Sequence, residues 1–418
     1  MKKLAILGGK PTLKNLKPYR SIGLKEKLAV NDVMRTGKIS SFFGSWRDGF
    51  LGGKKINELE NNWSRKFKVK HSISLNSNTS GLCAAVGAIG TNPGDEIIVP
   101  STSMSATAIA PLSYGAIPVF VDIDEETFCM SVEDVKRKIN KKTKAIIVVN
   151  LFGHPARLEE LKKIAEEREI FLIEDNAQAP LATENKKLTG TIGDIGVFSL
   201  NYHKHIHSGE GGICTTDNLK LADRMRMIRN HAEAVVGPAK VDDIVNMVGF
   251  NLRMTELSAA IAVEQLNDIE RHVNDRVKIA NFLSDNLSNL SGISVPKVRK
   301  KCTHVYYIWA IKYDENVTGV KRKVFVEALN AQGFPCYEAY LSPLYNLPLF
   351  QNRIAYGKNN YPFSLSKINY KKNMCPVAEK LCNDLFICFQ PCEFEIAGKK
   401  LELLAKAFLE VYSQRSKL

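Results

Sequence analysis

Short apolar runs alternate with helical stretches along residues 71 to 216. Runs of four or five β-branched and aliphatic residues predict strands over 72–75, 96–99, 118–121, 145–149, 170–173 and 196–200. Between two of these runs, apolar residues recur at helical spacing over 158–168, which predicts a helix. Strands that alternate with helices are typical of βα units on a mostly parallel sheet. The pattern therefore predicts an α/β fold.

Amphipathic helices flank this block. Ile56, Leu59, Trp63 and Phe67 share one helical face just before the first predicted strand. Apolar spacing over 255–271 predicts one long helix that continues toward a second domain. A chain of 418 residues exceeds one core of ordinary size, so two domains are expected. We predict an N-terminal segment over 1–50, a large domain with the central sheet over 51–274, and a smaller C-terminal α/β domain over 275–418.

The composition narrows the class of protein. Hydrophobic residues make up 44% and charged residues 24%, with a mean hydropathy of −0.15, as in globular domains that fold in water. No run approaches the roughly 18 apolar residues of a membrane span. The nine cysteines are scattered, and the close set at 375, 382, 388 and 392 lacks a CxxC pair, so reduced thiols are favoured over disulfides or zinc. We expect a cytoplasmic protein without a metal.

The chain is basic, with a formal net charge of +14 and a pI near 9.2. Such a balance permits a polyanionic partner. The basic residues are spread along the chain, however, and no zinc finger, homeodomain-like pattern or RNA-binding motif accompanies them. A phosphorylated small substrate or a solvated surface explains the charge equally well, so we expect no nucleic acid as partner.

An acidic residue stands where a buried strand is predicted to end. Residues 173–179 read Ile-Glu-Asp-Asn-Ala-Gln-Ala, and strand ends are where α/β sheets bind ligands. The carboxylate of Asp175 could hold a cofactor cation, a metal or a ribose hydroxyl, or it could cap the next turn. Taken alone, this segment favours the capping interpretation.

Lys204 follows another predicted strand. The segment 198–212 reads Phe-Ser-Leu-Asn-Tyr-His-Lys-His-Ile-His-Ser-Gly-Glu-Gly-Gly, so glycines let the backbone approach the lysine closely. Desolvation or neighbouring positive charge lowers the pKa of a lysine, which then serves as a nucleophile and proton carrier. His203, His205 and His207 alternate and could face a metal together, but loop histidines around a functional lysine are the interpretation we favour.

Small polar residues join the first predicted strand to a helix. Residues 76–81 read Asn-Ser-Asn-Thr-Ser-Gly, and amides and hydroxyls at a helix N-terminus can bind a phosphate. A plain N-cap needs only one such side chain. The segment alone supports phosphate binding and capping equally.

Taken together, these motifs resemble the DegT/DnrJ/StrS sugar aminotransferases, which have the aspartate aminotransferase (fold type I) architecture. The resemblance covers most of the chain and includes residues 94–101, 115–124, 151–155 and 249–256 besides the aspartate and lysine segments. Each motif is weak by itself, but their shared order and spacing are specific. The resemblance implies pyridoxal 5′-phosphate as cofactor.

The resemblance also implies catalytic roles. Lys204 would form the Schiff base with the cofactor and carry protons during the reaction. Asp175 would keep the pyridine nitrogen protonated, so that the ring can act as an electron sink. Met104 stands where the family usually places an aromatic ring against the cofactor face, which a thioether can also cover.

Further residues would bind the cofactor. The resemblance places Gln178 near its ring hydroxyl, and Asn78, Thr79 and Ser199 at its phosphate. Asn251 is expected to reach the phosphate of the neighbouring subunit's cofactor. That sharing implies a homodimer with shared active sites.

The implied reaction moves an amino group from glutamate or glutamine to a keto-sugar, such as a nucleotide-linked 3-keto or 4-keto deoxyhexose, for amino-sugar biosynthesis. Residues 4–11 and 375–379 look more like the branch that includes scyllo-inosose aminotransferases, so a cyclitol or free keto-sugar is an alternative acceptor. Some relatives are dehydratases with His in place of the lysine, whereas position 204 here is Lys. A non-catalytic regulator is a further alternative. Tyr202, His203 and His205 depart from the family pattern and leave the substrate contacts open.

Overall fold

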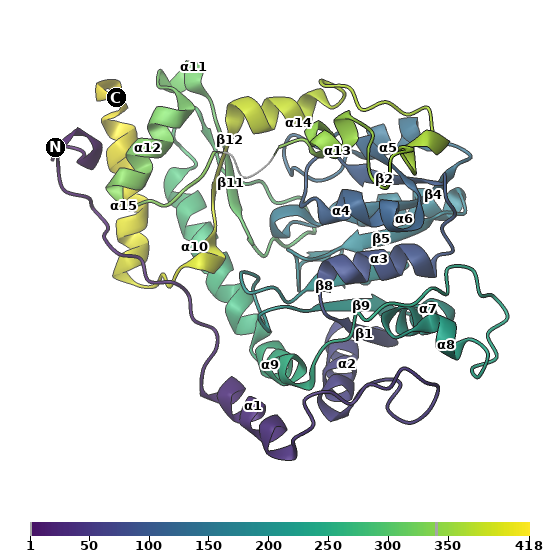
Figure 1. Ribbon diagram of the computed structural model, residues 1–418. Coiled ribbons are helices and arrows are strands. Elements are labelled where there is room, and N and C mark those ends of the chain that lie inside the picture. The colour runs from purple at the N-terminus through teal and green to yellow at the C-terminus, as the bar shows by residue number, and fades with distance from the viewer. Residues whose placement is uncertain (1, 339–341) are drawn as a thin grey trace.

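A seven-stranded sheet forms the centre of the computed structural model, which describes residues 2–338 and 342–418 (Figure 1). The strand order is β1-β9-β8-β5-β4-β2-β3, and β9 alone runs antiparallel to its neighbours. The strands are β1 (His71–Leu75), β2 (Glu96–Pro100), β3 (Ile117–Val121), β4 (Thr143–Val149), β5 (Phe171–Asp175), β8 (Ile195–Ser199) and β9 (Gly212–Thr216). The α/β fold, the mostly parallel sheet and the six predicted strands are confirmed, while β9 was not predicted.

Helices cover the sheet, and a second sheet follows along the chain. Three further strands, β10 (Ile293–Ser294), β11 (Trp309–Tyr313) and β12 (Phe386–Phe389), form this second sheet and pair antiparallel. The short strands β6 (Thr183–Glu184) and β7 (Lys187–Leu188) pair antiparallel with each other. The α-helices are α1 (Leu24–Thr36), α2 (Lys54–Phe67), α3 (Asn78–Ala88), α4 (Ala106–Ile109), α5 (Val132–Lys138), α6 (Leu158–Glu167), α7 (Leu219–Arg229), α8 (Ala232–Val235), α9 (Glu256–Asn267), α10 (Ile269–Leu287), α11 (Glu315–Thr318), α12 (Arg322–Gln332), α13 (Pro348–Gln351), α14 (Pro376–Lys380) and α15 (Lys399–Ser413).

The long helix predicted over 255–271 is wrong, because the chain breaks there into α9 and α10. Asp268 separates the two helices with φ −102° and ψ 7°, outside helical geometry. Its carboxylate accepts hydrogen bonds from Lys25 at 3.1 Å and Arg271 at 3.1 Å. Apolar spacing continues across the break, so periodicity could not reveal it.

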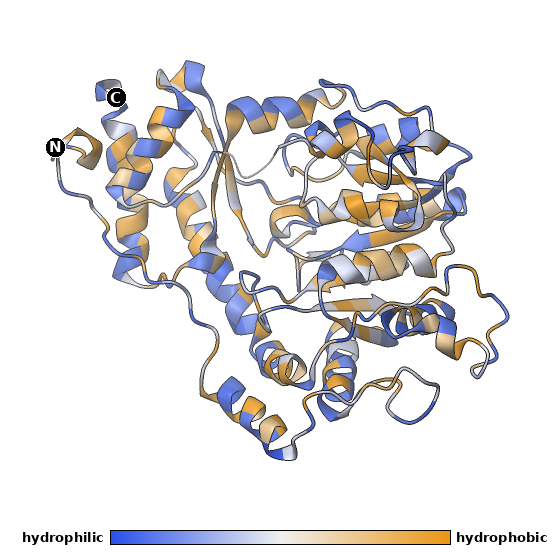
Figure 2. Cartoon of the chain, viewed as in Figure 1, coloured by the Kyte–Doolittle hydropathy of each residue, from blue (hydrophilic) through white to orange (hydrophobic). Residues whose placement is uncertain are grey.

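Hydrophobic residues make up much of the strands of the large sheet (Figure 2), and those buried on its strands and on the helices around it form a common core. The largest apolar cluster surrounds the seven-stranded sheet, and a second one joins α10, α12, α15 and β11. Within the described residues, no helix is both long and apolar enough to cross a membrane.

A C-terminal segment packs on the edge strand of the large sheet. The ring of Phe120 on β3 contacts Tyr345, Phe350 and Tyr370 at centroid distances of 5.8, 5.0 and 5.5 Å. The hydroxyl of Tyr370 donates to the backbone carbonyl of Pro118 at 2.9 Å. Residues late in the chain therefore share the core of the large sheet. The division into 1–50, 51–274 and 275–418 stays a prediction.

Candidate active site

A cavity of about 200 Å³ opens where β5 and β8 end and α3 begins. It brings together seven of the eight residues predicted for the site, although they come from four separate parts of the chain. They are Asn78, Thr79, Met104, Asp175, Gln178, Ser199 and Lys204. The sheet explains this convergence, because the carboxyl ends of its parallel strands meet along one edge.

Asp175 ends β5 with its carboxylate buried, at 3% exposure. Thr107 donates to Oδ2 at 2.8 Å, and Asn78 and the backbone N–H of Ala177 donate to Oδ1 at 3.3 Å each. Burial raises the pKa of Asp175, and these hydrogen bonds and the charge of Lys204 oppose the rise. A cation bound against this carboxylate would relieve the cost of its burial.

Lys204 reaches into the same cavity from the loop after β8. Burial lowers its pKa to about 8, while the charge of Asp175 acts in the opposite direction. Its ammonium nitrogen lies 4.2 Å from the ring centroid of Tyr307. Near neutral pH the amine is therefore close to the balance between its charged and neutral forms, as a proton carrier requires.

The N-terminus of α3 forms one wall of the cavity. Ser77 caps the helix by accepting a hydrogen bond from the N–H of Ser80 at 3.0 Å. Gly212 on β9 packs against this turn so closely that a Cβ there would lie 2.3 Å from the carbonyl oxygen of Ser77 and 2.6 Å from the nitrogen of Asn78. The backbone amides and hydroxyls at this helix end, with Ser199 opposite, suit a phosphate group.

Gln178 is oriented by a left-handed turn. Its Oε1 accepts the backbone N–H of Phe152 at 2.7 Å, and Phe152 has φ 61°. Because the side-chain oxygen is engaged in this way, the amide N–H₂ is the end of Gln178 that can donate to a ligand.

Three residues of the site were missed from the sequence. Thr107 binds Asp175 but lies on α4, 68 positions away, and no local signal marks it. Tyr307 lies under Lys204 and comes from the C-terminal third of the chain. Asn201 stood within the lysine motif and could have been noticed, since it lines the cavity and donates to Glu210 at 2.8 Å.

Asn251 does not line this cavity. Its backbone bridges to Asn230, and its Oδ1 accepts a hydrogen bond from Arg253 at 2.9 Å. The side chain is exposed, as a residue that reaches a neighbouring subunit must be. Its expected role toward a second subunit stays a prediction.

The alternating histidines do not share one face. His203 lines the cavity, whereas His205 is buried with its Nε2 donating to the carbonyl of Val305 at 2.8 Å. Burial lowers the pKa of His203 to about 4 and of His205 to about 3, so both rings are neutral at pH 7. Among the described residues, no group of three His, Cys, Asp or Glu side chains is placed to hold a metal.

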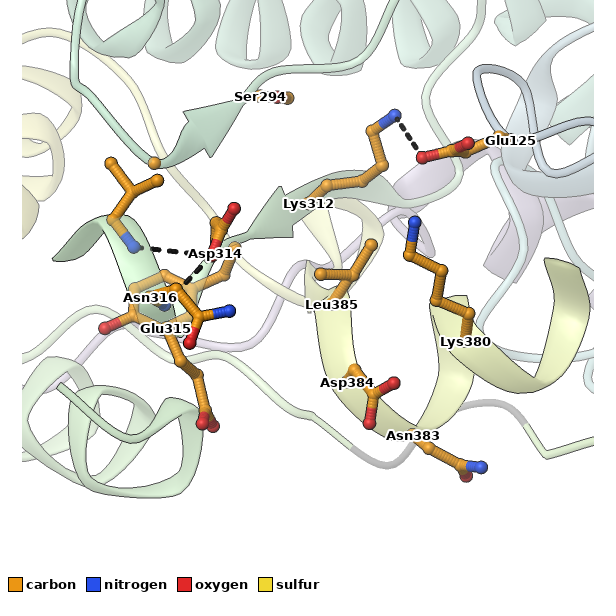
Figure 3. A pocket seen from close by; sticks show the side chains of 13 residues that line it. Glu125, Ser294, Lys312, Asp314, Glu315, Asn316, Lys380, Asn383, Asp384 and Leu385 are labelled. Atoms are coloured by element: carbon orange, nitrogen blue, oxygen red, sulfur yellow. Dashed lines mark hydrogen bonds and ion pairs between the residues drawn. The ribbon is translucent and has the colours of Figure 1, made fainter. Parts of the chain in front are cut away.

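A larger cleft of about 760 Å³ lies elsewhere, beside β10 and β11. Figure 3 shows Lys312 reaching across it to Glu125, an ion pair of 3.5 Å, and Asp314 capping the turn that follows β11. Side chains of both charges line it, and none of the predicted site residues does. The cavity around Lys204 and Asp175 is therefore the candidate active site.

Comparison with known proteins decides the family. The model of the DegT/DnrJ/EryC1/StrS aminotransferase family matches residues 42–387. The chain belongs to this family. The resemblance inferred from the motifs is thereby confirmed.

Relatives in this aminotransferase family span nearly the whole chain. GDP-perosamine synthase of Vibrio cholerae is 32% identical over 367 residues, which cover 87% of this chain and 94% of that protein. L-glutamine:2-deoxy-scyllo-inosose aminotransferase of Streptoalloteichus tenebrarius is 31% identical over 375 residues, 85% of each chain. The solved E. coli GDP-4-keto-6-deoxy-D-mannose-3-dehydratase with bound hydrated PLP has a TM-score of 0.77 and 25% identity over 94% of this chain and 100% of that one.

The protein is accordingly a pyridoxal-phosphate-dependent aminotransferase with the fold of type I enzymes. The groups that line the cavity also fit the cofactor, independently of the comparisons. It offers a buried carboxylate for a cationic ring nitrogen, a lysine amine near its midpoint of ionisation, and a helix N-terminus for a phosphate.

Proposed function

We propose that this enzyme moves an amino group from glutamate or glutamine to the 3-keto or 4-keto group of a nucleotide-linked deoxyhexose. The observation that carries the proposal is the convergence of Lys204, Asp175 and the N-terminus of α3 in one cavity. The relative named GDP-perosamine synthase supports a nucleotide-linked acceptor, and the net charge of +14 suits such an anion.

We assign the cofactor contacts from this arrangement. Asp175, oriented by Thr107 and Asn78, holds the protonated pyridine nitrogen. Asn78, Thr79 and Ser199 hold the phosphate, Gln178 donates toward the ring hydroxyl, and Met104 covers the ring face. When bound, pyridoxal 5′-phosphate supplies an electron sink for the carbon that carries the transferred nitrogen.

Lys204 performs the proton transfers. In the first half-reaction its neutral amine would accept the proton from the donor's α-carbon and its ammonium would pass a proton to the cofactor's aldehyde carbon. In the second half-reaction the lysine would carry a proton from that carbon to the acceptor carbon. The pKa of about 8 keeps both forms accessible near neutral pH. Lysine at this position also distinguishes the chain from relatives that carry histidine there and act as dehydratases.

A cyclitol is the second candidate acceptor. The 31% identity to the 2-deoxy-scyllo-inosose aminotransferase favours it, together with the resemblance of residues 4–11 and 375–379 to that branch. A non-catalytic regulator would not need a lysine amine buried in the same cavity as Asp175, and we rank it last.

We further propose a cytoplasmic homodimer whose subunits share active sites. Exposed apolar side chains lie on α1, on the loop that follows it and on the loop between α8 and α9: Leu24, Leu28, Met34, Phe43, Trp46, Ile244, Val248 and Phe250. Exposed apolar residues of this kind are typical of interfaces, and Asn251 directly follows Phe250, the last of them. The nine cysteines are all free thiols, as a reducing compartment would keep them.

Absorbance spectroscopy tests the reaction. The purified enzyme should show the visible band of bound pyridoxal 5′-phosphate, and glutamate or glutamine should bleach it with release of the corresponding keto acid. Lys204→Ala should lose both signals, whereas Lys163→Ala, at a lysine 77% exposed on α6, should keep them. Bleaching that persists in Lys204→Ala would refute the assigned role.

The acceptor is tested in the second half of the reaction. GDP-4-keto-6-deoxy-D-mannose and 2-deoxy-scyllo-inosose are offered to the donor-treated enzyme, and the one that restores the visible band is the acceptor type. Recovery only with the cyclitol would overturn the nucleotide-sugar proposal in favour of the second candidate.

Shared sites are tested by subunit mixing. Lys204→Ala and Asn251→Ala should each be impaired, and dissociating and reassociating them together should restore activity, because mixed dimers contain one intact site. A monomer in sedimentation, or no recovery after confirmed subunit exchange, would contradict the shared-site arrangement.

A further inference from the structure

The side chain of Lys204 lies over the face of a buried tyrosine. Its Nζ is 4.2 Å from the ring centroid of Tyr307, a residue just before β11 with no exposed surface. The ring is held in place, since Gln390 donates to its hydroxyl at 3.0 Å. The rings of His203 and His205 flank it at centroid distances of 6.1 and 6.2 Å.

We infer that the ring face of Tyr307 is the resting position of the Lys204 ammonium whenever that lysine is not bonded to the cofactor. This inference rests on the proposed function, in which the lysine leaves the cofactor and returns once in each half-reaction. The negative face of an aromatic ring attracts a cation within about 6 Å of its centroid. Tyr307 is thus a positioning residue, which holds the released amine beside the reacting carbon.

The groups around Lys204 determine how much the Tyr307 ring contributes to the stability of the charged lysine. Asp175 favours the ammonium by its charge, and burial disfavours it. Burial raises the pKa of the Cys392 thiol, which is therefore uncharged near neutral pH. His203 and His205 are neutral as well. The Tyr307 face, 4.2 Å from Nζ, is a contact that stabilises the positive charge without carrying a charge of its own.

The structure also explains why an aromatic ring suits this position better than a second carboxylate. A second acid beside Asp175 would fix the proton on Lys204 and keep the amine from acting as a base. A ring face attracts the ammonium more weakly and binds no proton itself. It therefore holds the lysine without removing its ability to accept and donate protons.

Fluorinated rings test the inference without removing the side chain. In the cofactor-free full-length protein, phenylalanine analogues with increasing numbers of ring fluorines replace Tyr307, because fluorine weakens the negative ring face while keeping its shape. The pKa of Lys204 is measured by acetic anhydride labelling across pH and mass spectrometry of the Lys204 peptide.

Tyr307→Phe should leave the pKa near its wild-type value, and progressive fluorination should lower it by about half a unit to one unit in total. The same analogues at the adjacent Tyr306, whose ring stacks on His304 at 3.9 Å, should not move it. A pKa that ignores fluorination at 307, or that drops fully in Tyr307→Phe, would overturn the inference.

The labelling experiment needs neither cofactor nor substrate. Its result therefore stands even if donors fail to bleach the visible band, which is the failure of the proposed function. Conversely, normal transamination with an unmoved Lys204 pKa would leave the proposed function intact and remove the role of Tyr307.

Discussion

Substituting Gly212 by alanine should disturb the N-terminus of α3, where we place the cofactor's phosphate, whereas the same substitution at an exposed glycine should not. The added Cβ would lie 2.3 Å from the carbonyl oxygen and 2.4 Å from the carbonyl carbon of Ser77, against 3.4 Å for ordinary contact. The Cβ and the helix N-terminus must therefore separate by about 1 Å, and the obstacle is backbone that no rotamer change can move.

The cost follows from overpacking. Forcing one extra carbon into a well-packed site typically costs about 1–3 kcal/mol, and here the displaced atoms are those that should bind the phosphate. We expect Gly212→Ala to lower the free energy of unfolding by that amount and to weaken pyridoxal phosphate binding by about tenfold or more, since about 1.4 kcal/mol is a factor of ten.

Urea unfolding and a fluorescence titration with pyridoxal 5′-phosphate measure the two effects. Gly237→Ala is the matched control, because its Cβ would meet nothing within 4 Å. If Gly212→Ala matches wild type in both unfolding midpoint and cofactor affinity, the packing argument is refuted. If it loses stability but keeps affinity, the assignment of the phosphate to this helix end is refuted.

Three further predictions concern buried charges. Asp175→Asn should raise the melting temperature of the cofactor-free protein, because burial raises the pKa of Asp175 and its charged form opposes folding at pH 7; an unchanged or lower melting temperature would contradict this. The pKa values of His154 and His205, lowered to about 4 and about 3, keep both rings neutral in the fold while the unfolded chain takes up protons below about pH 6.5. The midpoint of urea unfolding should therefore fall between pH 7 and pH 5, because each ring lowers the free energy of unfolding by up to about 1.4 kcal/mol per pH unit. A midpoint that does not change with pH would contradict the lowered pKa values of these two histidines. Arg229→Met should cost about 3–5 kcal/mol in urea unfolding, since it removes the cationic partner of the Glu60 carboxylate from a 2.7 Å buried ion pair and leaves only hydrogen bonds from Ser74. Adding Glu60→Gln should recover part of that loss.

Most of the fold could be predicted because its strands are buried on both faces and read as apolar runs. β9 escaped because it follows directly on a glycine-rich loop, begins with a glycine and has two threonines among its residues, so it does not read as an apolar run. The break at Asp268 escaped because the apolar stripe of α9 continues into α10. Both errors come from local patterns that pairing and packing override.

The site was predictable where function concentrates on strand ends and on one helix N-terminus, as with Asp175, Lys204 and Asn78. Contacts made between distant segments left no such pattern. Thr107 reaches Asp175 because β2, β4 and β5 are neighbours in the sheet, and Tyr307 reaches Lys204 because the C-terminal third folds against the sheet. Spacing along a chain carries no information on such approaches.

The packing of the C-terminal segment on β3 also means that the large sheet cannot finish folding until the end of the chain has been synthesised. Asp122, just after β3, accepts hydrogen bonds from the N–H groups of Val377 and Ala378 at 3.0 and 2.9 Å. During synthesis, β3 leaves the ribosome more than two hundred residues before these partners exist. Until then the sheet has an open edge able to pair with another chain. Translation speed and chaperone access over that interval therefore bear on the yield of native enzyme, even though the active site is encoded earlier.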